Sequence, residues 1–215
     1  GVSLADRIYD VLRGAIMEGK LRPGEAVVET DLAEQAGVSK TPVREALRLL
    51  AHDGLVFVLP RRGYVVKPLM LEEVAEIYAL RSILEPRIAA QAARRCVPSQ
   101  LVRLREAVDR YAGAADVRTE LLASLELHRL LCEMAGESRV TLIDEALIFE
   151  THRFFFLQPE PIDPLTQIAV LQHDRLYEAI ANADSEAAAV AIKEILANVQ
   201  EFFGTQFGRM RTILS

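Results

Sequence analysis

The sequence predicts a mainly α-helical chain in two domains: a small helical domain that ends in a β-hairpin, and a larger all-helical bundle. Apolar residues recur at helical spacing along most of the chain, and short strand-like apolar runs occur between residues 55 and 67. Seven of the eleven glycines lie within residues 1–68. Residues 1–68 hold 10 Lys and Arg against 9 Asp and Glu, whereas residues 69–215 hold 15 against 22. We therefore expect domains at residues 1–68 and 69–215.

The composition is that of a globular protein, with 51% hydrophobic and 26% charged residues. No run approaches about 18 consecutive apolar residues, so we expect no membrane span. The first residues lack the basic and then apolar layout of a signal peptide. Cys96 and Cys132 are too few for a disulfide framework and lack metal-binding spacing. We therefore expect a cytoplasmic location.

The first predicted helix covers residues 4–18 and ends at Gly19. Ser3 and Asp6 have the spacing of a capping box at its start. Its apolar residues form one stripe: Ile8, Val11, Leu12, Ala15 and Ile16. A turn at residues 23–24 follows.

Two further short helices are predicted around a tight corner at Gly37. Residues 30–36 form the second helix, with Thr30 as its N-cap. Ser39 or Thr41 caps the third helix, which stops at Gly54. One side of that helix is apolar, with Val43, Ala46, Leu47 and Leu50, and another side is basic, with Lys40, Arg44 and Arg48.

A hairpin follows, with apolar runs at residues 55–59 and 64–67 around a tip that contains Arg61 and Arg62. Three helices and a basic hairpin together describe a winged helix-turn-helix. The start of its third helix is the part that enters a DNA major groove, where Lys or Arg can bind guanine. The alternative is that these basic residues are only a solvated helix face. The candidate DNA-binding residues are Thr30, Ser39, Lys40, Thr41, Arg44, Arg48, Arg61 and Arg62.

Residues 19–24 (GKLRPG), 29–33 (ETDLA) and 37–47 (GVSKTPVREAL) resemble the DNA-binding domain of GntR-family transcription regulators. The resemblance implies that Ser39, Lys40, Thr41 and Arg44 contact operator DNA, assisted by the two hairpin arginines. The family usually has arginine at the position of Lys40. The substitution removes a planar fork that can donate two parallel hydrogen bonds.

The second domain is predicted to be helical throughout, without an alternating strand pattern. The expected helices are residues 71–95, 99–113, 118–135, 138–157, 165–182 and 185–206. The breaks lie at Pro98-Ser99, Gly113 with Asp116, Gly136, residues 158–164, and residues 182–184, where Asp184 caps the last helix.

Residues 77–85 (IYALRSILE), 127–137 (LHRLLCEMAGE) and 173–180 (HDRLYEAI) resemble the FCD ligand-binding domain of the FadR subgroup of those regulators. The resemblance implies a homodimer whose FCD-like bundle binds a small-molecule effector, often a carboxylate. Many FCD domains hold a divalent metal on one Asp and three His side chains. The matching positions here are Ser124, His128, His173 and Ile195, so two of four ligands are missing.

We therefore expect no metal and no other cofactor, the alternative being a divalent metal completed by Asn198, a water or another carboxylate. The candidate effector-binding residues are Arg81, Ser124, His128, Arg153, His173 and Asn198. Arg153 is the preferred partner of an effector carboxylate, and its alternative is an interhelix salt bridge. Arg81 has Glu85 at i+4 as a partner, and a single buried His is more often a satisfied core residue.

The chain lacks a glycine-rich phosphate loop, a G-x-S-x-G sequence and an H-E-x-x-H sequence, so we expect no enzyme. We expect a ligand-responsive repressor that binds a palindromic double-stranded DNA operator as a dimer and responds to a small organic acid. The alternatives are an enzyme and a scaffold that uses the winged helix only for protein contacts.

Overall fold

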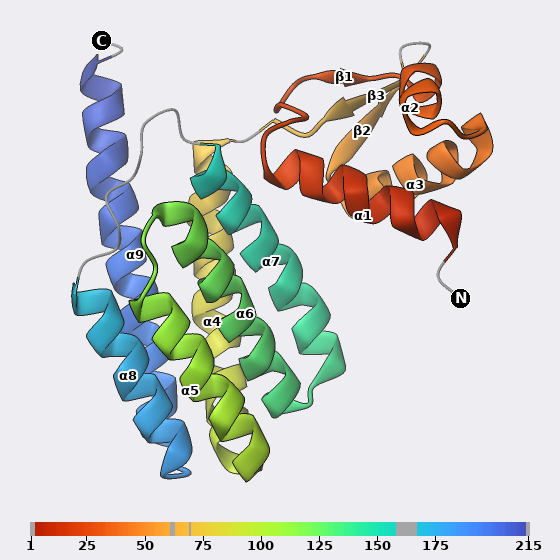
Figure 1. Ribbon diagram of the computed structural model, residues 1–215. Coiled ribbons are helices and arrows are strands. Elements are labelled where there is room, and N and C mark those ends of the chain that lie inside the picture. The colour runs from red at the N-terminus through yellow and green to blue at the C-terminus, as the bar shows by residue number, and fades with distance from the viewer. Residues whose placement is uncertain (1–2, 61–62, 69, 158–166, 214–215) are drawn as a thin grey trace. The chain divides into compact units, whose positions relative to one another are not determined.

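The computed structural model describes residues 3–60, 63–68, 70–157 and 167–213 (Figure 1). The chain divides into two compact units, residues 1–70 with 152–159 and residues 71–151 with 160–215. The first unit contains three helices and a three-stranded antiparallel sheet, and the second is helical in its described part. The predicted mainly α fold, a winged helix-turn-helix followed by a helical bundle, is confirmed.

The first helix, α1 (Leu4–Met17), begins at the predicted capping box. The backbone N–H of Asp6 donates to Ser3 Oγ, and the N–H of Ser3 donates to Asp6 Oδ2, both at 3.0 Å. Its buried residues are Ala5, Leu12 and Ile16. Val11 was predicted to belong to this stripe, but it is 70% exposed. At 100° per residue it lies about 120° from the centre of the buried face.

The next helices are α2 (Glu29–Ala36) and α3 (Lys40–His52). The prediction that Thr30 caps α2 is wrong, because the N-cap is Val28 and Thr30 lies in the first turn. Strand β1 (Ala26–Val27) ends one residue before this cap, so the helix starts directly from the sheet. Gly37 ends α2 in the left-handed conformation, and Ser39 is the N-cap of α3. The predicted apolar face of α3 is fully buried.

The hairpin consists of β2 (Val56–Leu59) and β3 (Gly63–Val66), paired in register from Val56↔Val66 to Leu59↔Gly63. Strand β1 adds to the other edge of β3 and was not predicted, because two residues are too few for an alternating pattern. A Cβ at Gly63 would lie 3.0 Å from the carbonyl oxygen of Val27, and the φ of Gly63 is +86°. Glycine therefore permits this close approach.

The second unit contains helices α4 (Leu71–Arg95), α5 (Pro98–Ala112), α6 (Val117–Ala135), α8 (Gln167–Ala181) and α9 (Ser185–Ile213). It also contains α7 (Ser138–Phe156) as far as Thr151, and the last residues of that helix belong to the first unit. In the bundle, α9 packs on α4 and α8, and α6 packs on α4 and α5 (Figure 1). The helix ends follow local signals. Asp116 caps α6 through a 2.7 Å bond from the Thr119 N–H, and Asp184 caps α9 through a 2.9 Å bond from the Ala187 N–H. Gly136 ends α6 at φ +64°.

One difference from the sequence prediction concerns the last helix. Helix α9 continues to Ile213 instead of ending at residue 206. Glycine in a helix interior costs only about 1 kcal/mol, so Gly204 and Gly208 do not end the helix. The predicted loop at residues 158–164 lies outside the described residues.

The bundle core is made of Leu, Ile, Ala and Val from α4, α5, α6, α8 and α9. Ile195, at the position of the fourth family metal ligand, is 6% exposed and part of this core. None of the helices in the described chain combines the length and hydropathy that a bilayer span requires.

Candidate nucleic-acid interface and buried polar cluster

The candidate DNA-binding side chains of α3 lie on its solvent side. Ser39, Lys40, Thr41, Arg44 and Arg48 are all exposed. Because the opposite face of α3 is buried in the core, these residues present one polar surface at the start of the helix. The N-terminal N–H groups and the helix dipole add attraction for phosphate there.

Arg44 forms an ion pair with Glu29, the first residue of α2. Arg44 Nε lies 3.0 Å from both carboxylate oxygens, and Nη2 lies 2.8 Å from Oε2. These hydrogen bonds, with the charges of Arg44, Lys40 and Arg48, lower the pKa of Glu29. Sequence analysis did not identify Glu29 as part of this surface. The two residues are 15 positions apart, and only the packing of α2 on α3 brings them together.

The other candidate DNA contacts have different positions. Thr30 is half-buried in the first turn of α2. The hairpin residues Arg61 and Arg62 lie outside the described residues.

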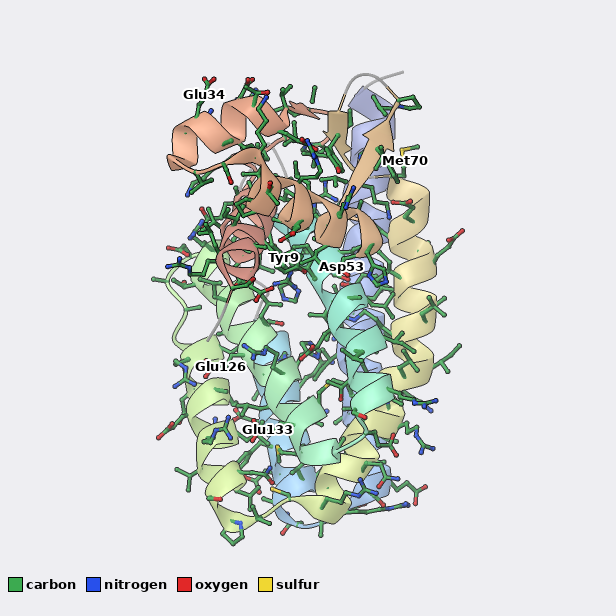
Figure 2. All side chains as sticks on the ribbon, turned by 90° about the vertical axis from the view of Figure 1, so that its right-hand side faces the viewer. Tyr9, Glu34, Asp53, Met70, Glu126 and Glu133 are labelled. Carbon is green, nitrogen blue, oxygen red and sulfur yellow. The ribbon has the colours of Figure 1, made fainter. Side chains whose placement is uncertain are left out.

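The far end of α3 is held by a hydrogen bond to α1. The Tyr9 hydroxyl donates to Asp53 Oδ2 at 2.6 Å, and the two side chains face each other in Figure 2. Burial and the neighbouring carboxylate raise the pKa of Tyr9 to about 12, so the phenol remains a donor at neutral pH. This bond joins α1 to the C-cap of α3.

The interior of the bundle contains a cluster of polar side chains, which we call the buried polar cluster: Arg81 and Glu85 of α4, His128 of α6, Thr151 of α7 and His173 of α8. Arg81 Nε donates to Glu85 Oε1, which is the i, i+4 pair expected from the sequence. Arg81 Nη1 donates to Thr151 Oγ1 at 3.3 Å, and Nη2 lies 3.4 Å from His128 Nε2. One guanidinium therefore connects three helices.

The contacts of His128 assign its tautomer. The guanidinium of Arg81 can only donate, so Nε2 of His128 is the acceptor and the ring proton is on Nδ1. Nδ1 lies 3.5 Å from Glu85 Oε2. Burial, and then the charges of Arg81 and His173, hold the pKa of His128 well below its ordinary value. His128 is therefore neutral at physiological pH.

Two carboxyl groups in the bundle have raised pKa values. Burial raises the pKa of Glu85, whose Oε2 has no hydrogen-bond partner within the described structure. Asp144 on α7 is 1% exposed, and burial and then the charge of Glu85 raise its pKa to about 7. The Cys132 thiol donates to Asp144 Oδ2 at 3.6 Å. Burial in the interior therefore disfavours negative charge on both carboxyl groups, including the one that is paired with Arg81.

His173 contacts Tyr111, with ring centroids 4.2 Å apart at an interplanar angle of 35°. The Tyr111 hydroxyl donates to Glu120 at 3.0 Å. The charge of His173 contributes to the lowered pKa of His128 and opposes the rise in the pKa of Glu85. Arg81, His128 and His173 are thus all buried within the bundle, and their roles in effector binding stay predictions.

Three further effector candidates have other surroundings. Ser124 is half-buried one turn before His128 on the same face of α6, whereas Asn198 is exposed on α9. Arg153 is fully buried and its Nη2 donates to the backbone carbonyl of Lys67, within the first unit. Arg153 follows Thr151 by two residues, which turns it by about 200° to the opposite side of α7. The surroundings of Arg153 and Asn198 described above thus differ from those of the buried polar cluster.

Within the ranges that the structure describes, no group of three or more His, Cys, Asp or Glu side chains is arranged to hold a metal ion. The expectation that the protein has no resident metal stays a prediction.

Comparison with protein families agrees with the two units. The model of bacterial regulatory proteins of the gntR family matches residues 4–66, and the FCD domain model matches residues 76–198. The resemblance inferred from the sequence motifs is therefore confirmed.

The chain is also similar to curated regulators over most of its length. The HTH-type transcriptional regulator YdhC of Bacillus subtilis strain 168 is 28% identical, with 85% of this chain and 83% of that protein covered. The HTH-type transcriptional repressor RspR of Escherichia coli K12 is 27% identical, with coverage of 91% and 86%. An HTH-type regulator of Streptomyces ambofaciens is 30% identical, with coverage of 86% and 79%.

Solved structures share the fold. E. coli McbR/YncC superposes with a TM-score of 0.82 at 22% identity, covering 96% of this chain and all of that chain. A GntR transcriptional regulator of Rhodococcus sp. RHA1 has a TM-score of 0.74 at 24% identity, with coverage of 93% and 96%.

The raised pKa of Asp144 predicts a pH-dependent stability. Between about pH 4 and pH 7, Asp144 is protonated in the folded chain and ionised in the unfolded chain. The folded state then binds more protons, so the free energy of unfolding falls as pH rises, by up to about 1.4 kcal/mol per pH unit. Asp144→Asn removes this contribution. Urea unfolding of both proteins across this pH range should show that the free energy of unfolding falls more steeply with pH in the unsubstituted chain.

His128, whose pKa is lowered in the folded chain, makes the free energy of unfolding rise with pH below its unfolded pKa. The effect of Asp144 is therefore measured as the difference between the variant and the parent. Glu186→Gln removes an exposed carboxyl of the same bundle and should keep the parent's pH dependence. Identical pH dependence in Asp144→Asn and the parent would contradict the assignment.

Proposed function

Because the chain belongs to the GntR family of bacterial regulatory proteins and contains an FCD domain, we propose that it is a repressor that binds a palindromic operator as a homodimer and responds to a small organic acid. The observation that carries the proposal is the exposed basic surface at the start of α3, within a winged helix-turn-helix. The 27% identity to the repressor RspR over 91% of the chain supports repression rather than activation.

In this proposal α3 enters the major groove and Arg44 contacts guanine, while Ser39, Lys40 and Thr41 bind phosphates or neighbouring bases. Arg48 lies one turn further along the same face and is placed to contact the DNA backbone. The overall negative charge does not oppose this, because the excess of acidic residues lies beyond residue 68.

We expect a dimer because a palindromic operator has two half-sites. One recognition helix covers only a half-site, and a two-fold dimer matches a palindrome with two such helices. We expect exposed apolar side chains of the bundle to make the contact between copies, among them Leu80 and Ile83 of α4, and Leu142 and Ile143 of α7. Exposed apolar groups of this kind often mark protein contacts.

The buried polar cluster is the proposed effector site. An organic acid would replace Glu85 as the partner of Arg81, with His128 and His173 as further hydrogen-bonding groups and Ser124 beside them. The raised pKa of Glu85 favours its protonation when the acid's carboxylate takes its place. Arg81 is preferred over Arg153 because Arg153 lies on the opposite side of α7 and binds the Lys67 carbonyl. No resident metal is part of this proposal.

The first functional prediction concerns Arg44. Arg44→Ala should weaken binding to a duplex selected by the parent protein from a randomised library by about 1–3 kcal/mol, because it removes one base contact. Fluorescence anisotropy titration measures this loss. Arg94→Ala, which removes an exposed arginine from the bundle, serves as the control and should bind as the parent does. Unchanged affinity in Arg44→Ala would refute the role of α3.

The second concerns assembly. Light scattering after size exclusion should give about twice the 23.9 kDa chain mass. Ile83→Asp places a charge on the proposed apolar contact and should shift the protein to monomer, because an unpaired charge is costly to bury. Val102→Asp, at an exposed apolar position on α5, should remain dimeric. A monomeric parent protein, or equal behaviour of the two variants, would argue against this contact.

The third concerns the effector. A carboxylic acid bound in the cluster should stabilise the protein by about 2.7 kcal/mol at 100 times its Kd. A thermal-shift screen of organic acids should detect such a ligand. The shift should disappear in Arg81→Gln combined with Glu85→Gln, a pair that leaves no uncompensated buried charge. It should persist in Arg153→Gln.

Metal content tests the same site independently. Elemental analysis of protein without a His-tag should find no stoichiometric zinc, nickel or manganese. One equivalent of metal that is lost in His128→Ala would overturn the metal-free site.

A further inference from the structure

An acidic side chain lies in the middle of the basic surface of α3. Glu29 accepts three contacts from Arg44 at 2.8–3.0 Å, and Lys40 and Arg48 are close enough to lower its pKa as well. Its side chain is 21% exposed, whereas that of Arg44 is 48% exposed. A carboxylate at this place repels DNA phosphates, so its presence on a DNA-binding surface requires a compensating effect.

The contact geometry specifies which part of Arg44 remains available. A guanidinium has five N–H groups, one on Nε and two on each terminal nitrogen. Glu29 engages the Nε edge, using the Nε–H and one Nη2–H. Both Nη1–H groups and the second Nη2–H are not used by the carboxylate. One N–H from each of these two nitrogens forms the outer end of the guanidinium, and this pair has the spacing that matches O6 and N7 of guanine.

We propose that Glu29 is a positioning residue that determines base specificity by holding Arg44 end-on toward the major groove. The inference rests on the proposed DNA-binding function. A free arginine side chain samples many rotamers, and ordering it on binding reduces affinity. Glu29 orders the guanidinium in the free protein, so binding to a correctly placed guanine requires less loss of side-chain entropy.

The carboxylate also has a second effect on the competing, non-specific mode of binding. Non-specific affinity comes from positive charge near phosphates, and Glu29 compensates part of that charge. Glu29 therefore strengthens the specific contact and weakens the non-specific one. An ion pair that served only folding would not affect these two modes in opposite directions.

Glu34 provides a matched control on the same helix. It lies five residues after Glu29, which turns it by about 140°, and it extends from α2 in Figure 2. Glu34→Gln removes the same charge from α2 without changing the hydrogen bonds of Arg44. Glu29→Asp provides the complementary variant, because it keeps the charge and shortens the side chain that reaches Arg44.

The experiment titrates the full-length protein against the duplex that it selects from a randomised library and against a scrambled duplex. For Glu29→Gln we expect about tenfold weaker binding to the selected duplex and about threefold tighter binding to the scrambled one. Glu29→Asp should weaken the selected duplex similarly and leave the scrambled one unchanged. Glu34→Gln should leave the ratio of the two affinities at the parent value. Thermal unfolding confirms that each variant is folded.

Combining Glu29→Gln with Arg44→Ala tests whether Glu29 acts through Arg44. The specificity ratio of the double variant should equal that of Arg44→Ala alone. One outcome refutes the positioning role alone: the parent binds its selected duplex, Arg44→Ala weakens this binding, and Glu29→Gln has the same ratio of selected to scrambled affinity as Glu34→Gln. DNA recognition by Arg44 would then still stand. If the parent binds no duplex, the proposed function itself fails.

Discussion

Burial within the bundle determines the charge states of the ionisable side chains that lie there. A cation that is 4% exposed requires partners, and Glu85, Thr151 and His128 supply acceptors from three helices. Burial of His128, and then the positive charges of Arg81 and His173, disfavour its protonation. One carboxylate compensates the guanidinium, and a second one, at Asp144, is held largely protonated up to about pH 7.

Two Arg–Glu pairs in this chain have opposite consequences because their surroundings differ. The Arg81–Glu85 pair is buried, so removing either member leaves an uncompensated charge in a low-dielectric interior. The Arg44–Glu29 pair is half exposed, so solvent screens it and a DNA base can join it without a large desolvation penalty. The buried pair holds helices together, and the exposed pair orients a side chain.

The sequence predicted the parts of the structure that depend on local signals. The cap at Asp184 and the left-handed residue at Gly136 end helices through contacts within a few positions, so the helix boundaries agree closely. Strand β1 was missed because it exists only as a partner of β3. The pairing of Glu29 with Arg44 was missed for a related reason, since it requires two helices to pack in a particular register. Tertiary contacts of this kind leave no periodic pattern.

Because residue 40 is lysine, discrimination between bases depends more on the orientation of Arg44. The related family usually has arginine at this position, and an arginine there would add a second planar fork at the start of the recognition helix. Lysine keeps the positive charge but donates from a single rotatable ammonium, which attracts phosphate or guanine without a fixed geometry. Among the described residues of α3 the bidentate geometry then depends on Arg44 and Arg48, and only Arg44 has a carboxylate on its Nε edge. In this chain, therefore, discrimination between bases at the start of α3 depends on how firmly Glu29 holds one guanidinium.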